Sequence, residues 1–484
     1  MKDENNTWQG DSPMSIWMHA CWPDSRPVGR VRKIFFSLVV GVLGFVLYQE
    51  GTLRSGLADP TAVDNSSIVE GTPITMREAV RKALKLRPLR KIDQDRVRNL
   101  RSTVAQTRSS FYPQLSASYQ NTYGNSFLGF FLFPNYQFVD AQLMTVTLTQ
   151  LIFDFGRTSS QLSQRKWSLR AQKDVYEETS QALIRDVENA YYNLLADIEQ
   201  ETVTHLNVID ARNHLDASLV RLQAGMGLKA DVIQANVNLS NAVLERIQAV
   251  NLRKKAQIVL ATTIGDTTEI HYVPVIDFSL PAGLRARLAS DLEKAGRKNP
   301  SLLQARHSLV AAEENLKAAW RQNYPSLTGL AQYFLAQIPS SALPFPGLPN
   351  YPYSSFAIGG TLNVPIFEGG GNVAQIHQAR AFLNESVHQE QESELNVSSQ
   401  VRQAYLDIVE ARQQLAESRT EEENALEYDR LEEGSYSAGK ATALDVIDAQ
   451  TALRKARADL ITAKYSLSQK VVLYHYAVGD LSPP

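Results

Sequence analysis

The sequence predicts a mainly α-helical fold with a β-barrel portion, built from two equivalent halves. Three observations carry this prediction. Short motifs in the first half return in the same order in the second half. Two very long stretches, 157–224 and 372–433, contain neither glycine nor proline. Four short segments instead alternate polar and apolar residues, which is the pattern of strands rather than helices.

The repeat is visible in landmarks that return at a nearly constant offset along the chain. Tyr112-Pro113 returns as Tyr324-Pro325, and Ala224-Gly225 returns as Ala438-Gly439. Other matched positions are Arg87-Pro88 with Asn299-Pro300, Phe153-Asp154 with Phe367-Glu368, Ala190-Tyr191 with Ala404-Tyr405, and Ile264-Gly265 with Val478-Gly479. An offset that holds over most of the chain predicts an internal duplication, with halves at residues 72–270 and 287–480.

Each half contains one very long predicted helix and a shorter partner. The two stretches without glycine or proline are rich in strong helix formers. Apolar residues recur in them at a spacing of three to four, as expected for packed helices. Each would extend about 100 Å at about 1.5 Å per residue. Turns at Gly225 and Gly439 should fold the chain back onto second helices at 228–264 and 440–478.

The alternating segments lie at residues 114–123, 144–149, 327–335 and 356–364, and the alternation is less regular in the second half. Strands of about ten residues with one apolar face are typical of membrane β-barrels. Four strands cannot close a barrel, and an open sheet edge cannot face lipid because its backbone groups would be unsatisfied. Two copies would give a barrel filled by side chains, whereas three copies give 12 strands and leave a lumen.

The N-terminal segment is predicted to be a secretory signal over residues 1–58 with a long basic region. Four basic residues between positions 26 and 33 precede the apolar run Ile34–Tyr48, and the small-residue site Gly56-Leu57-Ala58 follows it. A membrane anchor is the alternative, although the apolar run is short for a span. Translation could also start at Met14 or Met18.

Composition argues against several classes of function. The formal net charge of −2 gives no basic footprint for nucleic acid. Cys21 is the only cysteine, so no disulfide framework is expected. Gly369-Gly370-Gly371 lacks the lysine of a phosphate loop, and the eight histidines show no ligand spacing. We therefore expect no enzyme activity, no cofactor and no metal.

Four motifs, taken in order, resemble the outer-membrane efflux protein (TolC-like) family over about residues 72–480. They are F-Y-P-Q-L at 111–115, L-I-F-D-F-G at 151–156, Y-S-A-G at 436–439 and L-D-V-I-D-A at 444–449. The resemblance implies a homotrimer with a 12-stranded barrel in outer-membrane lipid and a helical barrel in the periplasm. It also implies a periplasmic adaptor (membrane fusion protein) and an inner-membrane pump or ABC transporter as partners. The chain would then be a passive conduit for efflux or type I secretion.

The resemblance further implies a gate at the periplasmic end. The family's aspartates fall on Asp445 and Asp448, and three copies would form a ring of carboxylates that favours cations. Ordinary helix chemistry is the alternative, because Thr442 and Asp445 have the spacing of a capping box. In that family, bonds between the turns of the two repeats hold the gate shut, and this latch would involve Asp231 and Tyr436 here. The family also has an arginine two residues after the second turn glycine. That position is Ala441 in this chain, so the adjacent Lys440 could substitute.

The turns at Gly225 and Gly439 match the family's adaptor-contact region, although a plain glycine helix stop explains the residue type equally well. A catalytic pair formed by Asp445 and Asp448 and a soluble coiled-coil scaffold remain as alternatives to the export duct. A scaffold would stay soluble on fractionation, whereas the duct would be found in the outer membrane. The sequence leaves the cargo open among drugs, metals and proteins.

Overall fold

The computed structural model describes residues 71–125, 138–266, 268, 271–275, 287–337 and 352–482. All of them belong to one compact unit, Ile68–Pro484. The predicted signal at residues 1–58 lies outside the described residues.

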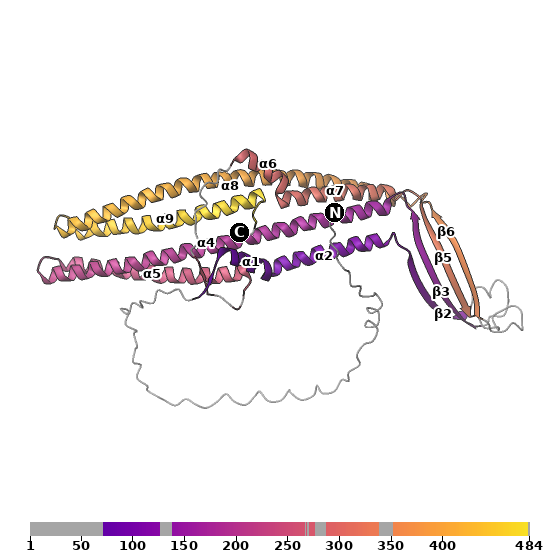
Figure 1. Cartoon of the computed structure of the whole chain (residues 1–484), viewed down its shortest axis with the longest axis horizontal. Helices are drawn as coiled ribbons and strands as arrows, with labels where there is room; N and C mark the ends of the chain where they lie inside the picture. The colour runs from indigo at the N-terminus through magenta and orange to yellow at the C-terminus, as the bar shows by residue number, and fades with distance from the viewer. Residues whose placement is uncertain are drawn as a thin grey trace, which may run out of the picture. The chain divides into compact units, whose positions relative to one another are not determined.

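Two sets of elements follow one another along the chain (Figure 1). The first set is β1 (Thr72–Ile74), α1 (Met76–Leu86), α2 (Pro88–Ser109), β2 (Gln114–Asn125), β3 (Phe138–Phe153), α4 (Arg157–Gln223), α5 (Lys229–Ile264) and β4 (Tyr272–Pro274). The second set is α6 (Leu288–Lys298), α7 (Pro300–Arg321), β5 (Ser326–Gln337), β6 (Pro352–Asn363), α8 (Gly371–Ser437) and α9 (Ala443–Val478). Corresponding helices have equal lengths of 11, 22, 67 and 36 residues.

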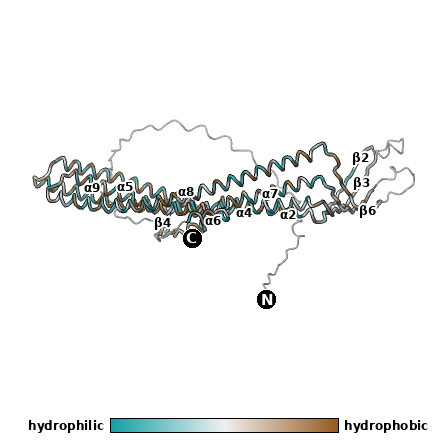
Figure 2. Tube along the Cα trace, turned by 90° about the horizontal axis from the view of Figure 1, so that it is seen from above, coloured by the Kyte–Doolittle hydropathy of each residue, from teal (hydrophilic) through white to brown (hydrophobic). Residues whose placement is uncertain are grey.

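The long helices α4 and α8 are present as predicted. Helix α8 continues through Gly434 to Ser437, past the end of its glycine-free stretch. A single glycine in a helix costs only about 1 kcal/mol, which the packing of α8 on α9 offsets. Hydrophilic and hydrophobic residues are mixed along these helices (Figure 2). Among the described residues, no helix is both long and apolar enough to cross a bilayer.

The long helices lie side by side, with α1 and α6 packed against them (Figure 1). Helix α4 packs against α5, α7, α2 and α9, and helix α8 packs against α7 and α9. Helices α7 and α9 therefore both lie between α4 and α8, and they follow each other end to end along the long helices. At their junction the Asn299 side chain donates to the Ala477 carbonyl at 2.9 Å, and its Oδ1 accepts from Ser301 N at 3.0 Å.

The apolar core lies near the middle of the long helices. One cluster joins the α4 residues Val187, Tyr191 and Leu194 to α1, β1, β4 and the end of α5. A second cluster joins the middle of α8 to α6 and the C-terminal half of α9. Toward the α4–α5 and α8–α9 turns only two small clusters remain, each with three buried residues. The packing is thus strongest at mid-length and thin toward the turns.

The strands form one antiparallel sheet in the order β2-β3-β5-β6. The register pairs Gln114 with Thr149 and Ser326 with Asn363. All four predicted strands are present at 12, 16, 12 and 12 residues, longer than expected. Within the described segments, β2 and β6 each have one unpaired edge.

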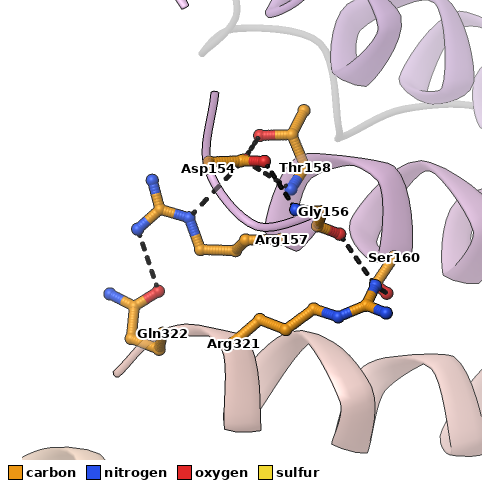
Figure 3. Close-up of polar contacts among 7 residues, drawn as sticks. All are labelled: Asp154, Gly156, Arg157, Thr158, Ser160, Arg321 and Gln322. Carbon is orange, nitrogen blue, oxygen red and sulfur yellow. Dashed lines mark hydrogen bonds and ion pairs between the residues drawn. The ribbon is translucent and has the colours of Figure 1, made fainter. Parts of the chain in front are cut away.

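The joint between β3 and α4 is fixed by Asp154, whose side chain is buried (Figure 3). Its carboxylate accepts from Thr158 N at 2.7 Å and from Gly156 N at 3.1 Å. These bonds satisfy N–H groups at the start of α4 that have no partner within the helix. Phe155 and Gly156 adopt left-handed φ values of 53° and 81°, which turn the chain from strand to helix.

Helix α7 is tied to the same joint from the second set of elements. The Arg321 guanidinium donates to the Gly156 carbonyl at 3.0 Å and also to the Ser160 hydroxyl (Figure 3). Arg157 donates to Gln322 Oε1 at 3.3 Å. The motif L-I-F-D-F-G is therefore a strand exit whose geometry depends on a carboxylate cap and on the end of α7.

Two left-handed glycines allow a matched test of this packing. A Cβ on Gly479, with φ of +80°, would lie 2.5 Å from Asn299 Cα, whereas a Cβ on Gly439, with φ of +72°, would meet nothing within 4 Å. We expect Gly439→Ala to cost only the left-handed strain, about 1–2 kcal/mol. Gly479→Ala should cost about 1–3 kcal/mol more, because the α7–α9 junction must shift. Denaturant unfolding of the two variants checks this, and equal midpoints would contradict it.

Candidate functional site

The candidate site is the pair of turns at the ends of the long hairpins, α4–α5 and α8–α9. Gly225 and Gly439 both adopt left-handed φ with open space around them. Met226 N donates to the Arg221 carbonyl and Lys440 N to the Ser435 carbonyl, each at 2.9 Å. These are helix-ending bonds, and they account for the glycines locally. A role of the turns in adaptor contact remains a prediction.

The two predicted gate aspartates differ in their surroundings. The Asp445 carboxylate accepts from Thr442 N at 2.8 Å and from Thr442 Oγ1 at 2.7 Å, so it closes the capping box of α9. Hydrogen bonds from the Thr442 backbone and side chain hold the pKa of Asp445 below its usual value. Asp448 is exposed and forms no hydrogen bond or ion pair within the described segments. Its carboxylate is therefore open to solvent.

The structure does not join the three predicted latch residues. Asp231 accepts from Leu228 N at 3.1 Å and caps α5. Lys440 is exposed at the other turn. In the described part of the chain, no hydrogen bond links either residue to Tyr436. The latch stays a prediction, and within one copy these residues do not form it.

Tyr436 instead contacts α4 through Arg221. The Arg221 guanidinium donates to the Tyr436 carbonyl at 2.9 Å and lies 4.0 Å from the centroid of the Tyr436 ring. The His214 ring lies 5.7 Å from the same ring. Sequence reasoning missed Arg221 and His214, because no local pattern shows which α4 residues face α8. The one available signal was that Arg221 and Tyr436 both stand shortly before a turn glycine.

A cavity of about 320 Å³ lies beside this contact, between α4, α8 and α9. Its charged lining comprises Asp210, Arg221, Asp429, Glu433, Arg454 and Arg457. Burial raises the pKa of Asp429, with Glu433 and Asp210 adding to the shift and Arg457 opposing it. His214 Nε2 and Asp429 Oδ1 are buried without a hydrogen-bond partner. The hairpin ends are thus joined through a polar, incompletely packed region.

Burial also lowers the pKa of His214, which is only 8% exposed. Glu433 and Asp231 act against this shift, whereas Arg221 reinforces it. The packed arrangement therefore favours the neutral ring.

Comparisons with known proteins show which family the chain resembles. A family model described as "Outer membrane efflux protein" matches residues 80–266 and 292–474. The chain is 26% identical over 393 residues to outer membrane protein TolC of Escherichia coli (strain K12), covering 78% of this chain and 77% of that protein. It is 22% identical to the alkaline protease secretion protein AprF of Pseudomonas aeruginosa, covering 67% of each.

Solved structures share the fold. The crystal structure of the outer membrane protein VceC from Vibrio cholerae superposes with a TM-score of 0.72 at 18% identity. The match covers 84% of this chain and 96% of that chain.

The lowered pKa of His214 predicts a pH effect at the hairpin ends. Protonation favours states in which the ring reaches water, so the packed state should weaken as the pH falls below about 6.5, the ordinary histidine value. We expect hydrogen exchange at residues 215–228 to be several-fold faster in the wild type than in His214→Gln at a pH of about 5.5, but equal at about 7.5. Because Asp429 is present in both proteins, its opposite shift cancels in this ratio. A ratio that does not change with pH would contradict the prediction.

Proposed function

The chain belongs to the outer membrane efflux protein family, and we propose that three copies of it assemble into one duct with a shared 12-stranded β-barrel. The protein is an efflux or secretion channel of the outer membrane, with its helical tunnel in the periplasm. The family is one of transport conduits rather than enzymes. A soluble coiled-coil scaffold is not favoured, since the relatives are outer membrane proteins.

The sheet carries the assembly proposal. Its edges, β2 and β6, lie at opposite sides of the four strands. Pairing β2 of one copy with β6 of the next satisfies both edges and repeats around a ring until it closes. The helices support the same arrangement. Helices α5 and α2 form one outer side of the helical part and α8 forms the other, so each side is free to pack against a neighbouring copy.

The equal helix lengths and the two matched family segments support an origin by internal duplication, with halves at 72–270 and 287–480. We further propose that residues 1–58 direct export and are removed. A periplasmic adaptor and an inner-membrane pump or ABC transporter would complete the pathway. Both drug efflux and protein secretion fit, because the relatives include proteins named for efflux and for secretion.

The gate proposal places Asp445 and Asp448 of each copy around the periplasmic end of the lumen. Asp448 is the stronger candidate, because Asp445 is engaged in capping α9. A ring of free carboxylates in a narrow pore favours cations over anions. Asp231 and Lys440 remain candidates for contacts between neighbouring copies, and Gly225 and Gly439 for contacts with the adaptor.

Single-channel recording in planar bilayers tests the channel and the gate together. The wild type should conduct and should be blocked by a trivalent cation such as lanthanum, because the Asp448 ring binds it. Asp448→Ala should weaken this block about tenfold or more, which corresponds to about 1.4 kcal/mol per tenfold. Glu423→Ala, which removes an exposed carboxylate on α8 instead of α9, serves as the control. Unchanged block in Asp448→Ala would remove the gate assignment.

A further inference from the structure

The contact between Arg221 and Tyr436 lies closer to the turns than the other side-chain bonds between the two hairpins. Farther from the turns, Arg454 donates to Asn238 Oδ1 at 3.4 Å, and Lys464 and Tyr465 both donate to Glu199 Oε1 at 2.6 Å. Separating the turns therefore requires the Arg221 contact to break first.

Arg221 uses two features of Tyr436, and neither is its hydroxyl group. The guanidinium lies over the ring, with 4.0 Å from its carbon to the ring centroid, and one N–H donates to the backbone carbonyl at 2.9 Å. That carbonyl belongs to the last turn of α8, where the helix dipole favours a cation. Within the described residues, the Tyr436 hydroxyl makes no hydrogen bond. Phenylalanine could therefore replace the side chain without losing either feature.

We propose that Arg221 is the clasp that holds the two hairpin ends of each copy together in the closed duct, acting through the ring and the backbone carbonyl of Tyr436. This inference rests on the proposed gated channel. It differs from a latch built on Asp231, which would need the tyrosine hydroxyl as its partner.

The surroundings leave the clasp with little support. The clusters nearest the turns contain only three buried residues each, and the cavity beside Tyr436 removes further packing. Two of the polar atoms at this interface, on His214 and Asp429, are buried without partners, so they do not reinforce the contact. Loss of the guanidinium should consequently shift the ends toward separation.

The test compares three variants of the full chain in planar bilayers. Arg221→Met keeps most of the apolar stem but removes the charge and the donors, so its mean conductance should rise several-fold. Tyr436→Leu keeps the carbonyl but removes the ring, and should raise the conductance in the same direction. Tyr436→Phe keeps both features and should conduct as the wild type does.

The opposite pattern would overturn the clasp: an open Tyr436→Phe channel together with a closed Arg221→Met channel would show that the hydroxyl holds the gate. Thermal melts followed by circular dichroism check that each variant is folded. If no protein conducts, including the wild type, the proposed channel function fails. The clasp is then judged only by the distance between the α4–α5 and α8–α9 turns.

Spin labels measure that distance independently of conductance. Since Cys21 is the only cysteine, Cys21→Ser gives a clean background for labels at Met226→Cys and Ala438→Cys, which are exposed positions on the two turns. The label-to-label distances should lengthen and broaden in Arg221→Met and stay unchanged in Tyr436→Phe. An unchanged distribution in Arg221→Met would refute the clasp.

Discussion

The backbone hydrogen bonds at the edges of the sheet are the constraint on which the rest of the structure depends. Water can satisfy an open edge, but lipid cannot, and each unsatisfied group costs several kcal/mol. The described residues of one copy supply a four-stranded sheet with two open edges, and such a sheet cannot span a membrane alone. In the proposed assembly, sharing the barrel between copies removes those edges. The same sharing would place the helices of several copies side by side and close them into a tube.

The distribution of buried apolar residues divides each copy into a firm part and a loose part. Near the middle of α4, one apolar cluster joins the first set of elements to Ile461, Tyr465 and Val472 of α9, and a second cluster packs α8 on α6 and α9 within the second set. Toward the turns the interface becomes polar, with a cavity and unpartnered atoms at His214 and Asp429. Regions with few buried apolar contacts open at lower free energy than the core. A gate at the turns therefore needs no separate hinge domain.

The elements were largely predictable because their signals are local. Residue period and the absence of glycine and proline located the four long helices, and alternation located the four strands. The capping of α9 by Asp445 was also visible in the spacing to Thr442. The pairing of Arg221 with Tyr436 was not visible, because the two residues are far apart in the sequence and meet only because α4 packs on α9, the helix that pairs with α8. Asp231 was assigned to the latch by resemblance, yet its geometry is that of a helix cap.

The sharing of one barrel by several copies is tested most directly by native mass measurement of the protein extracted from the outer membrane in detergent. Three copies per particle are predicted, since three is the smallest number whose combined strands leave a lumen. A monomer or dimer that still conducts in planar bilayers would contradict the shared barrel, because its sheet edges would have no partners.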